Sequence, residues 1–217
     1  IQASLVGSEM CIRDRSNRLP ILFLPGDTYA NRMPDPVLQQ VEHFNNPGIT
    51  QNDAFKSVTR YFDRITRPEQ ILQTLPQAIQ VLLDPADCGP ACISLSQDIQ
   101  GETYDYPEEF FVERVHNIRR PKPDDFQVKQ AVEKIKNSNN PLIISGGGVF
   151  YSNAMEELSS FAIKHNIPVT QTVMGYSSMK RDHSHFLGPI GGLGGKAANN
   201  LATVSYTHLT LPTNDRV

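Results

Sequence analysis

Short apolar runs alternate with stretches of helical periodicity along this chain. The runs are unbroken, as expected of strands buried on both faces of a parallel sheet. The predicted strands lie at residues 21–24, 91–95, 142–144 and 168–173. The predicted helices lie at residues 35–44, 54–65, 66–83, 126–136 and 154–164. Because strands and helices alternate over short links, the pattern predicts an α/β fold with parallel sheets.

Two segments interrupt this regular pattern. Pro76 lies inside the helix predicted at 66–83, where proline weakens helical continuity. Residues 97–125 are acidic, aromatic and rich in proline, which is typical of a connection between domains. We therefore expect one domain at residues 16–106, a linker at 107–125 and a second domain at 126–203. Within the linker, we interpret the sequence Glu108-Glu109-Phe110-Phe111 as a short helix that packs its aromatic rings. We do not interpret its two glutamates as a pair of acid/base carboxylates.

The composition excludes several classes of partner. A net charge of -3 gives no indication of a nucleic-acid or anionic-membrane partner. No apolar run approaches the roughly 20 residues of a membrane-spanning helix. Cys88 and Cys92 form a Cys-x-x-x-Cys pair without a second pair or a nearby histidine, so buried thiols of a cytoplasmic protein are favoured over a metal site.

Glycine-rich turns are the main candidates for binding chemistry. Gly146, Gly147 and Gly148 follow a predicted strand and precede a helix, where backbone amides can approach a phosphate. A tight packing turn is the equally weighted alternative. Residues 191–195 form a second such turn. His183 and His185 are interpreted as solvated loop residues rather than metal ligands, since no third ligand has a matching spacing.

The two ends of the sequence are related at the level of DNA. Codons that encode residues 10–14 (Met-Cys-Ile-Arg-Asp) have a reverse complement that encodes Val-Ser-Tyr-Thr-His, the sequence of residues 204–208. The flanks resemble translated arms of a sequencing adapter. We therefore expect residues 1–15 and 204–217 to be an artefact and exclude them from the fold prediction.

Within residues 16–203, the order of segments resembles the thiamine-diphosphate-dependent enzymes. Residues 19–28 and 31–40 resemble the end of their pyrimidine-binding domain, and residues 89–100 resemble its last strand. Residues 141–148 resemble the opening of their Rossmann-like central domain. The similarity to acetohydroxyacid synthase is general.

A closer resemblance is to the hydrolases that open trihydroxycyclohexane-1,2-dione in myo-inositol catabolism. The shared motifs are the Arg-x-Pro-Asp-Pro-Val-Leu-Gln-Gln stretch at 32–40, Asn52-Asp53-Ala54, Arg60-Tyr61, Asp63-Arg64-Ile65-Thr66, Asp105 and Phe110-Phe111. The resemblance implies a homo-oligomeric enzyme that uses thiamine diphosphate and Mg²⁺ to open the ring of a cyclic polyol dione to a deoxyglucuronate. An acetohydroxyacid synthase-like carboligase or decarboxylase, and a nucleotide-binding regulatory module, are the alternatives.

The resemblance also implies where the cofactors bind. We expect the catalytic glutamate and the magnesium-binding segment of this family to lie outside the sequence, so no catalytic or metal-binding residue is assigned. Gly26, Asp27 and Gln39 are the expected thiamine diphosphate neighbours, although Gln39 is equally consistent with a helix-surface amide. In relatives the central-domain glycine turns bind FAD or ADP or are vestigial, which makes Gly146–Gly148 weaker candidates.

Overall fold

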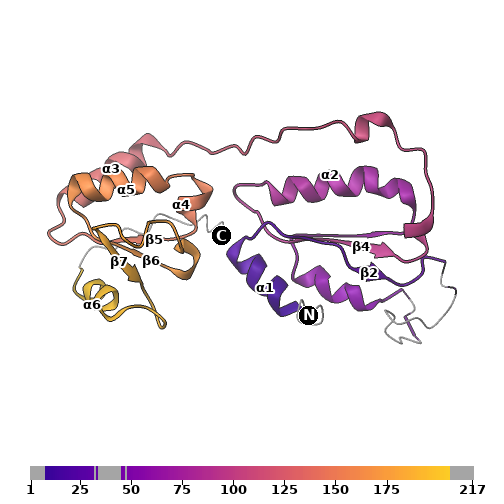
Figure 1. The fold of residues 1–217 in the computed structure, drawn as a ribbon, viewed down its shortest axis with the longest axis horizontal. Helices are drawn as coiled ribbons and strands as arrows, with labels where there is room; N and C mark the ends of the chain where they lie inside the picture. Colours follow the sequence, from indigo (N-terminus) through magenta and orange to yellow (C-terminus); the bar gives the residue numbers. More distant parts are fainter. Residues whose placement is uncertain (1–7, 32, 34–44, 47, 206–217) are drawn as a thin grey trace. The chain divides into compact units, whose positions relative to one another are not determined.

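The computed structural model describes residues 8–31, 33, 45–46 and 48–205. The chain forms two compact units, Ile1–Ile118 and Arg119–Val217, each of which is described by itself (Figure 1). The helix predicted at 35–44 and the candidate Gln39 lie outside the described residues.

A four-stranded parallel sheet organises the first unit. Its central strand is β4 (Ala91–Ser96), which pairs on one side with β1 (Leu22–Phe23) and β2 (Gly26–Asp27) and on the other with β3 (Tyr61–Ile65). The strands predicted at 21–24 and 91–95 are confirmed. Pairing with β4 resumes after Pro25, because β2 lies beside Leu95 and Ser96 of the same strand.

The helix predicted at 54–65 is wrong. The segment begins as a 3-10 helix, η2 (Gln51–Ser57), and then becomes strand β3. Thr50 caps the 3-10 helix, with its side chain accepting a hydrogen bond from the amide of Asn52. The amide of Arg60 donates to the carbonyl of Pro90 and starts the pairing with β4. Pairing of the whole of β3 with β4 overrides the local periodicity, as tertiary context does for strands.

Helix α2 (Ile71–Leu82) follows the short helix η3 (Pro68–Gln70) and confirms the helix predicted over this region. Pro76 lies inside α2 without ending it. The core of the unit is the buried cluster of Ile65, Ala78, Ala91 and Ile93. Because these residues come from β3, α2 and β4, the helix and the sheet are held together by one apolar contact surface.

The second unit contains a three-stranded parallel sheet in the order β5 (Ile143–Ser145), β6 (Val169–Gln171) and β7 (Phe186–Pro189). The α-helices of this unit are α3 (Asp125–Lys136), α4 (Gly148–Tyr151), α5 (Met155–His165) and α6 (Lys196–Val204), and the 3-10 helix η6 (Val173–Gly175) follows β6. Ala162 of α5 is buried with Val169 of β6 and Met179. The strands and helices predicted between 126 and 173 are thus confirmed, and the fold class is α/β.

The segment that follows β4 contains two short 3-10 helices, η4 (Ile99–Gly101) and η5 (Glu108–Phe110). The ring of Tyr106 stacks on Phe110 with centroids 6.1 Å apart and meets Phe111 edge-on. The predicted packing of aromatics after Glu108 and Glu109 is therefore confirmed. No helix in the described ranges is long and apolar enough to cross a membrane.

Helix α1 (Ser8–Asn17) covers part of the predicted adapter sequence. Asp14 is buried, with 7% of its surface exposed. The Arg15 guanidinium donates to the carbonyl of Thr59 in the same unit. The N-terminal flank therefore contacts the first unit, and its artefactual origin stays a prediction.

Candidate functional site

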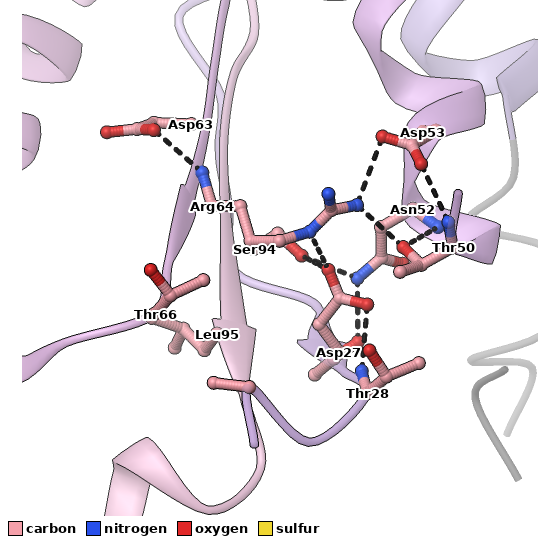
Figure 2. A network of polar contacts seen from close by, with 12 residues as sticks. Asp27, Thr28, Thr50, Asn52, Asp53, Asp63, Arg64, Thr66, Ser94 and Leu95 are labelled. Atoms are coloured by element: carbon pink, nitrogen blue, oxygen red, sulfur yellow. Dashed lines mark hydrogen bonds and ion pairs between the residues drawn. The ribbon is translucent and has the colours of Figure 1, made fainter. Parts of the chain in front are cut away.

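Polar side chains converge near the carboxyl ends of three neighbouring strands in the first unit (Figure 2). Asp27 ends β2, Arg64 lies near the end of β3, and Ser94 faces Arg64 across the β3–β4 pair. Asp27 is 1% exposed and Ser94 is fully buried. Ligands of open parallel sheets bind outside the carboxyl ends of the strands, so this edge is the candidate site of the first unit.

The Arg64 side chain joins three elements at this edge. Its Nε donates to Oδ2 of Asp27 at 2.7 Å, and its Nη2 donates to Oγ1 of Thr50 at 2.7 Å and to Oδ1 of Asp53 at 3.0 Å. Lys56 Nζ lies 2.7 Å from the same Asp53 oxygen. Two carboxylates thus face two cations, and the ion pairs connect η2 to β2 and β3.

Asp27 is saturated with hydrogen bonds from its own unit. Oδ1 accepts from the amide of Thr28 at 2.8 Å, while Oδ2 accepts from Arg64 and from the hydroxyl of Ser94. Burial by itself raises the pKa of Asp27, but the hydrogen bonds from Ser94 and Arg64 outweigh it and hold that pKa below its ordinary value. Asp27 is therefore a fixed anion near neutral pH and a poor proton carrier.

Asn52 closes the network around Gly26. Its Nδ2 donates to the carbonyl of Gly26 and to Oγ of Ser94, each at 2.7 Å. The structure thus places the candidates Gly26 and Asp27 in strand β2, with the carboxylate of Asp27 buried. Their predicted role as cofactor neighbours stays a prediction.

The turn that follows β2 is held by a second carboxylate. Asp98 accepts hydrogen bonds from the amide of Ala30 at 2.8 Å and from the amide of Asn31 at 3.1 Å. Slight burial raises the pKa of Asp98, but these backbone hydrogen bonds lower it overall. The amides of Thr28, Ala30 and Asn31 are therefore all engaged within the unit.

Two features of the described residues bear on where Mg²⁺ and the diphosphate could bind. No cluster of three or more His, Cys, Asp or Glu side chains among them could hold a metal ion. The turn amides that could have bound a phosphate already donate to Asp27 and Asp98.

In the second unit, the turn at Gly146–Gly148 closes on itself. The amide of Val149 donates to the carbonyl of Gly146, and the amide of Phe150 donates to the carbonyl of Gly147. The glycine with the tightest steric requirement is instead Gly175, since a Cβ there would lie 2.2 Å from the carbonyl oxygen of Ser145. Sequence reasoning missed Gly175, because a single glycine beside Tyr176 gives no pattern.

The second glycine turn is tied to the helix that follows it. Asn199 in α6 accepts from the amide of Gly191 at 2.9 Å and donates to its carbonyl at 3.0 Å. Gly191 has φ +108°, a backbone conformation that favours glycine. At the carboxyl end of β6, the buried Oε1 of Gln171 has no hydrogen-bond partner in the described part of the chain.

The remaining candidates from the sequence are two histidines and two cysteines, and their surroundings indicate structural roles. Nε2 of His185 lies 3.0 Å from Oδ1 of Asn166, and its Nδ1 lies 2.9 Å from Oγ of Ser184. His183 and His185 both belong to the loop before β7, and both residues are only partly exposed. Cys88 and Cys92 are buried, as predicted, and burial raises the pKa of Cys88.

Comparison with known proteins shows which families this chain is similar to. Residues 128–206, which cover most of the second unit, match the family described as the thiamine pyrophosphate enzyme central domain. An X-ray structure of a Mycobacterium smegmatis protein, described as thiamin diphosphate-dependent, has the same fold. It superimposes with a TM-score of 0.57 and 21% identity, over 85% of this chain and 34% of that chain.

Other relatives are more similar to this chain in sequence. The chain is 52% identical over 186 residues to the 3D-(3,5/4)-trihydroxycyclohexane-1,2-dione hydrolase of Clostridium perfringens and 48% identical over 187 residues to that of Bacillus subtilis. These matches confirm the resemblance seen in the sequence. Each covers 86% of this chain and 29% of the relative, so the chain spans under a third of the length of these relatives.

Proposed function

We propose that this chain is a piece of a thiamine diphosphate-dependent hydrolase that opens the ring of trihydroxycyclohexane-1,2-dione to a deoxyglucuronate. The observation that carries the proposal is the 52% identity over 186 residues, a length that neither unit alone could supply. The identity of 52% is the average over the whole matched stretch. It is much higher than the 21% shared with the thiamin diphosphate-dependent protein of the same fold.

In such an enzyme, we expect this chain to serve as a scaffold and to form part of the surface that surrounds the bound cofactor. Bound thiamine diphosphate would supply the electron sink that allows the ring C–C bond to break. The Asp27–Arg64–Asp53 network locks β2, β3 and η2 together at the carboxyl edge of the first sheet. Because both carboxylates are paired and have lowered pKa values, they hold their position and charge rather than transfer protons. We expect the catalytic glutamate and the Mg²⁺ ligands in other parts of the enzyme.

We further propose that the complete enzyme is a cytoplasmic homo-oligomer that uses Mg²⁺. Exposed apolar side chains on strands of both sheets support assembly, since Leu22 is 37% exposed and Ile144 is 41% exposed. Leu24, just beyond β1, is 53% exposed. Further strands or a second subunit would cover these surfaces.

The proposal is tested with the complete enzyme that carries this sequence. It is incubated with the cyclic dione, thiamine diphosphate and Mg²⁺, and the products are separated by chromatography. We expect a linear deoxyglucuronate that disappears when the cofactor is omitted or EDTA is added. Formation of an acetohydroxy acid from pyruvate, with no action on the dione, would refute the proposal and support the carboligase alternative.

One observation favours a second candidate function, nucleotide binding by the second unit. The unpartnered Oε1 of Gln171 lies at the carboxyl end of the middle strand, at the edge that carries both glycine turns. A buried acceptor without a donor costs free energy that a ligand could recover. Titration of the full chain with FAD and with ADP, followed by calorimetry, tests this function. Absence of saturable heat at high micromolar ligand would remove it.

A further inference from the structure

Asp98 joins two distant parts of the first unit. It lies just after β4, and its two carboxylate oxygens accept from the amides of Ala30 and Asn31, which are 68 and 67 positions away in the sequence. A carboxylate that binds two main-chain amides forms charge-assisted hydrogen bonds, which are stronger than neutral ones. Asp98 therefore acts as a clamp on the turn that leaves β2.

Carboxylates on either side hold the main chain of the clamped turn. Residues 28–31 belong to no helix or strand, and three of their main-chain amides donate to carboxylates on either side, from Thr28 to Asp27 and from Ala30 and Asn31 to Asp98. The side chain of Asn31 also accepts a hydrogen bond from the amide of Met33 at 2.8 Å. Asp27 is fixed in turn by Arg64 and Ser94. The turn is thus positioned by two side chains and lies beyond the carboxyl end of β2, on the ligand side of a parallel sheet.

We propose that Asp98 is a positioning residue, which holds the Thr28–Asn31 turn in the shape that the complete enzyme needs to bind its cofactor. The inference rests on the proposed function, because it assumes that this edge of the sheet faces thiamine diphosphate. Asp98 itself acts only through Ala30 and Asn31. The carboxylate offers one oxygen to each N–H donor, whereas an asparagine amide would offer a single, uncharged oxygen to both.

Asp124 provides a matched control in the same chain. Its Oδ1 accepts from the amides of Phe126 at 3.0 Å and Gln127 at 3.1 Å and so caps α3 in the second unit. Like Asp98→Ala, Asp124→Ala removes a carboxylate that accepts hydrogen bonds from two backbone amides. The bonds are lost from the end of helix α3 instead of from the turn at residues 28–31. A purely stabilising role for Asp98 predicts that both alanine variants behave alike.

The first experiment follows amide hydrogen exchange in the 217-residue chain. We expect Asp98→Ala to accelerate exchange at Ala30 and Asn31 on the order of tenfold, because the turn opens locally, while Asp124→Ala leaves both amides unchanged. Asp98→Asn should accelerate exchange to a smaller extent and serves if the alanine variant does not fold. Unchanged exchange in the folded Asp98 variants would overturn the clamp.

The second experiment measures the Kd of thiamine diphosphate with Mg²⁺ for the complete enzyme by calorimetry. We expect Asp98→Ala to raise the Kd on the order of tenfold, as misplacement of a binding turn does, and Asp124→Ala to leave it unchanged. Equal effects of the two variants, or no effect of Asp98→Ala, would overturn the positioning role. The affinity is read without substrate, so failure of the wild-type enzyme to open the dione would refute the proposed function alone.

Discussion

Removal of the Arg64 side chain should destabilise the first unit more than any exposed ion pair could. Arg64→Met leaves Asp27 buried at 1% exposure, with its hydrogen bond from Ser94 but without a cation. An uncompensated buried charge costs about 3–5 kcal/mol, and the 21% exposure of the Arg64 side chain gives water little access to the pair. We therefore expect a loss in this range in the free energy of opening around β4.

A double-mutant cycle isolates the ion pair. The free energy of opening is measured by amide hydrogen exchange along β4 in the wild type, in Arg64→Met, in Asp27→Asn and in the double variant. Because Asp27→Asn removes the stranded charge, the double variant should lose about 2 kcal/mol less than the sum of the single variants.

Arg67→Met is the control for this cycle. Arg67 is 71% exposed and lies 3.6 Å from Glu69, so its loss should cost under about 1 kcal/mol. Equal losses in Arg64→Met and Arg67→Met, or strict additivity in the cycle, would refute the view that Arg64 neutralises a buried carboxylate.

Three further predictions follow from other features. Because the pKa of Asp27 is lowered by folding, its ionised carboxylate stabilises the folded protein at pH values above 3.8, its ordinary pKa, and this stabilisation is lost as the pH falls through the folded-state pKa. Acid unfolding should therefore depend less steeply on pH in Asp27→Asn, and an unchanged curve would count against this. Gly175→Ala should lower the melting temperature of the second unit, because its Cβ would meet Ser145, whereas Gly192→Ala, which faces open space, should not. Deletion of residues 1–15 should cost the first unit roughly 1–3 kcal/mol, because it removes the hydrogen bonds from Arg15 to Thr59 and from Leu19 to Asp14, and a loss of the fold would contradict their artefactual origin.

The sequence pattern predicted the elements whose apolar residues are continuous or regularly spaced. Strand β4 is almost wholly buried, so its apolar run is unbroken, and α2 places Ile71 and Leu75 against the core. Strand β3 was missed because Asp63 and Arg64 interrupt its apolar residues. Those charged residues are tolerated in a strand only because side chains from other elements satisfy them, which local pattern does not reveal.

The candidate site was predictable only in part for the same reason. The resemblance pointed to Gly26 and Asp27, yet the partners that bury Asp27 come from positions 37 and 67 residues away. The clamp formed by Asp98 also depends on strand order, since β4 must lie beside β2 before the carboxylate can reach Ala30. Long-range pairing of this kind leaves no periodicity in the sequence.

The most direct test of the proposed function follows the oxygen of water into the product. The complete enzyme is supplied with the cyclic dione in ¹⁸O-labelled water, and the product is analysed by mass spectrometry. Hydrolytic ring opening predicts a linear acid that keeps every carbon of the substrate and contains ¹⁸O in its new carboxylate. Release of CO₂, or an unchanged cyclic dione in the presence of thiamine diphosphate and Mg²⁺, would contradict it.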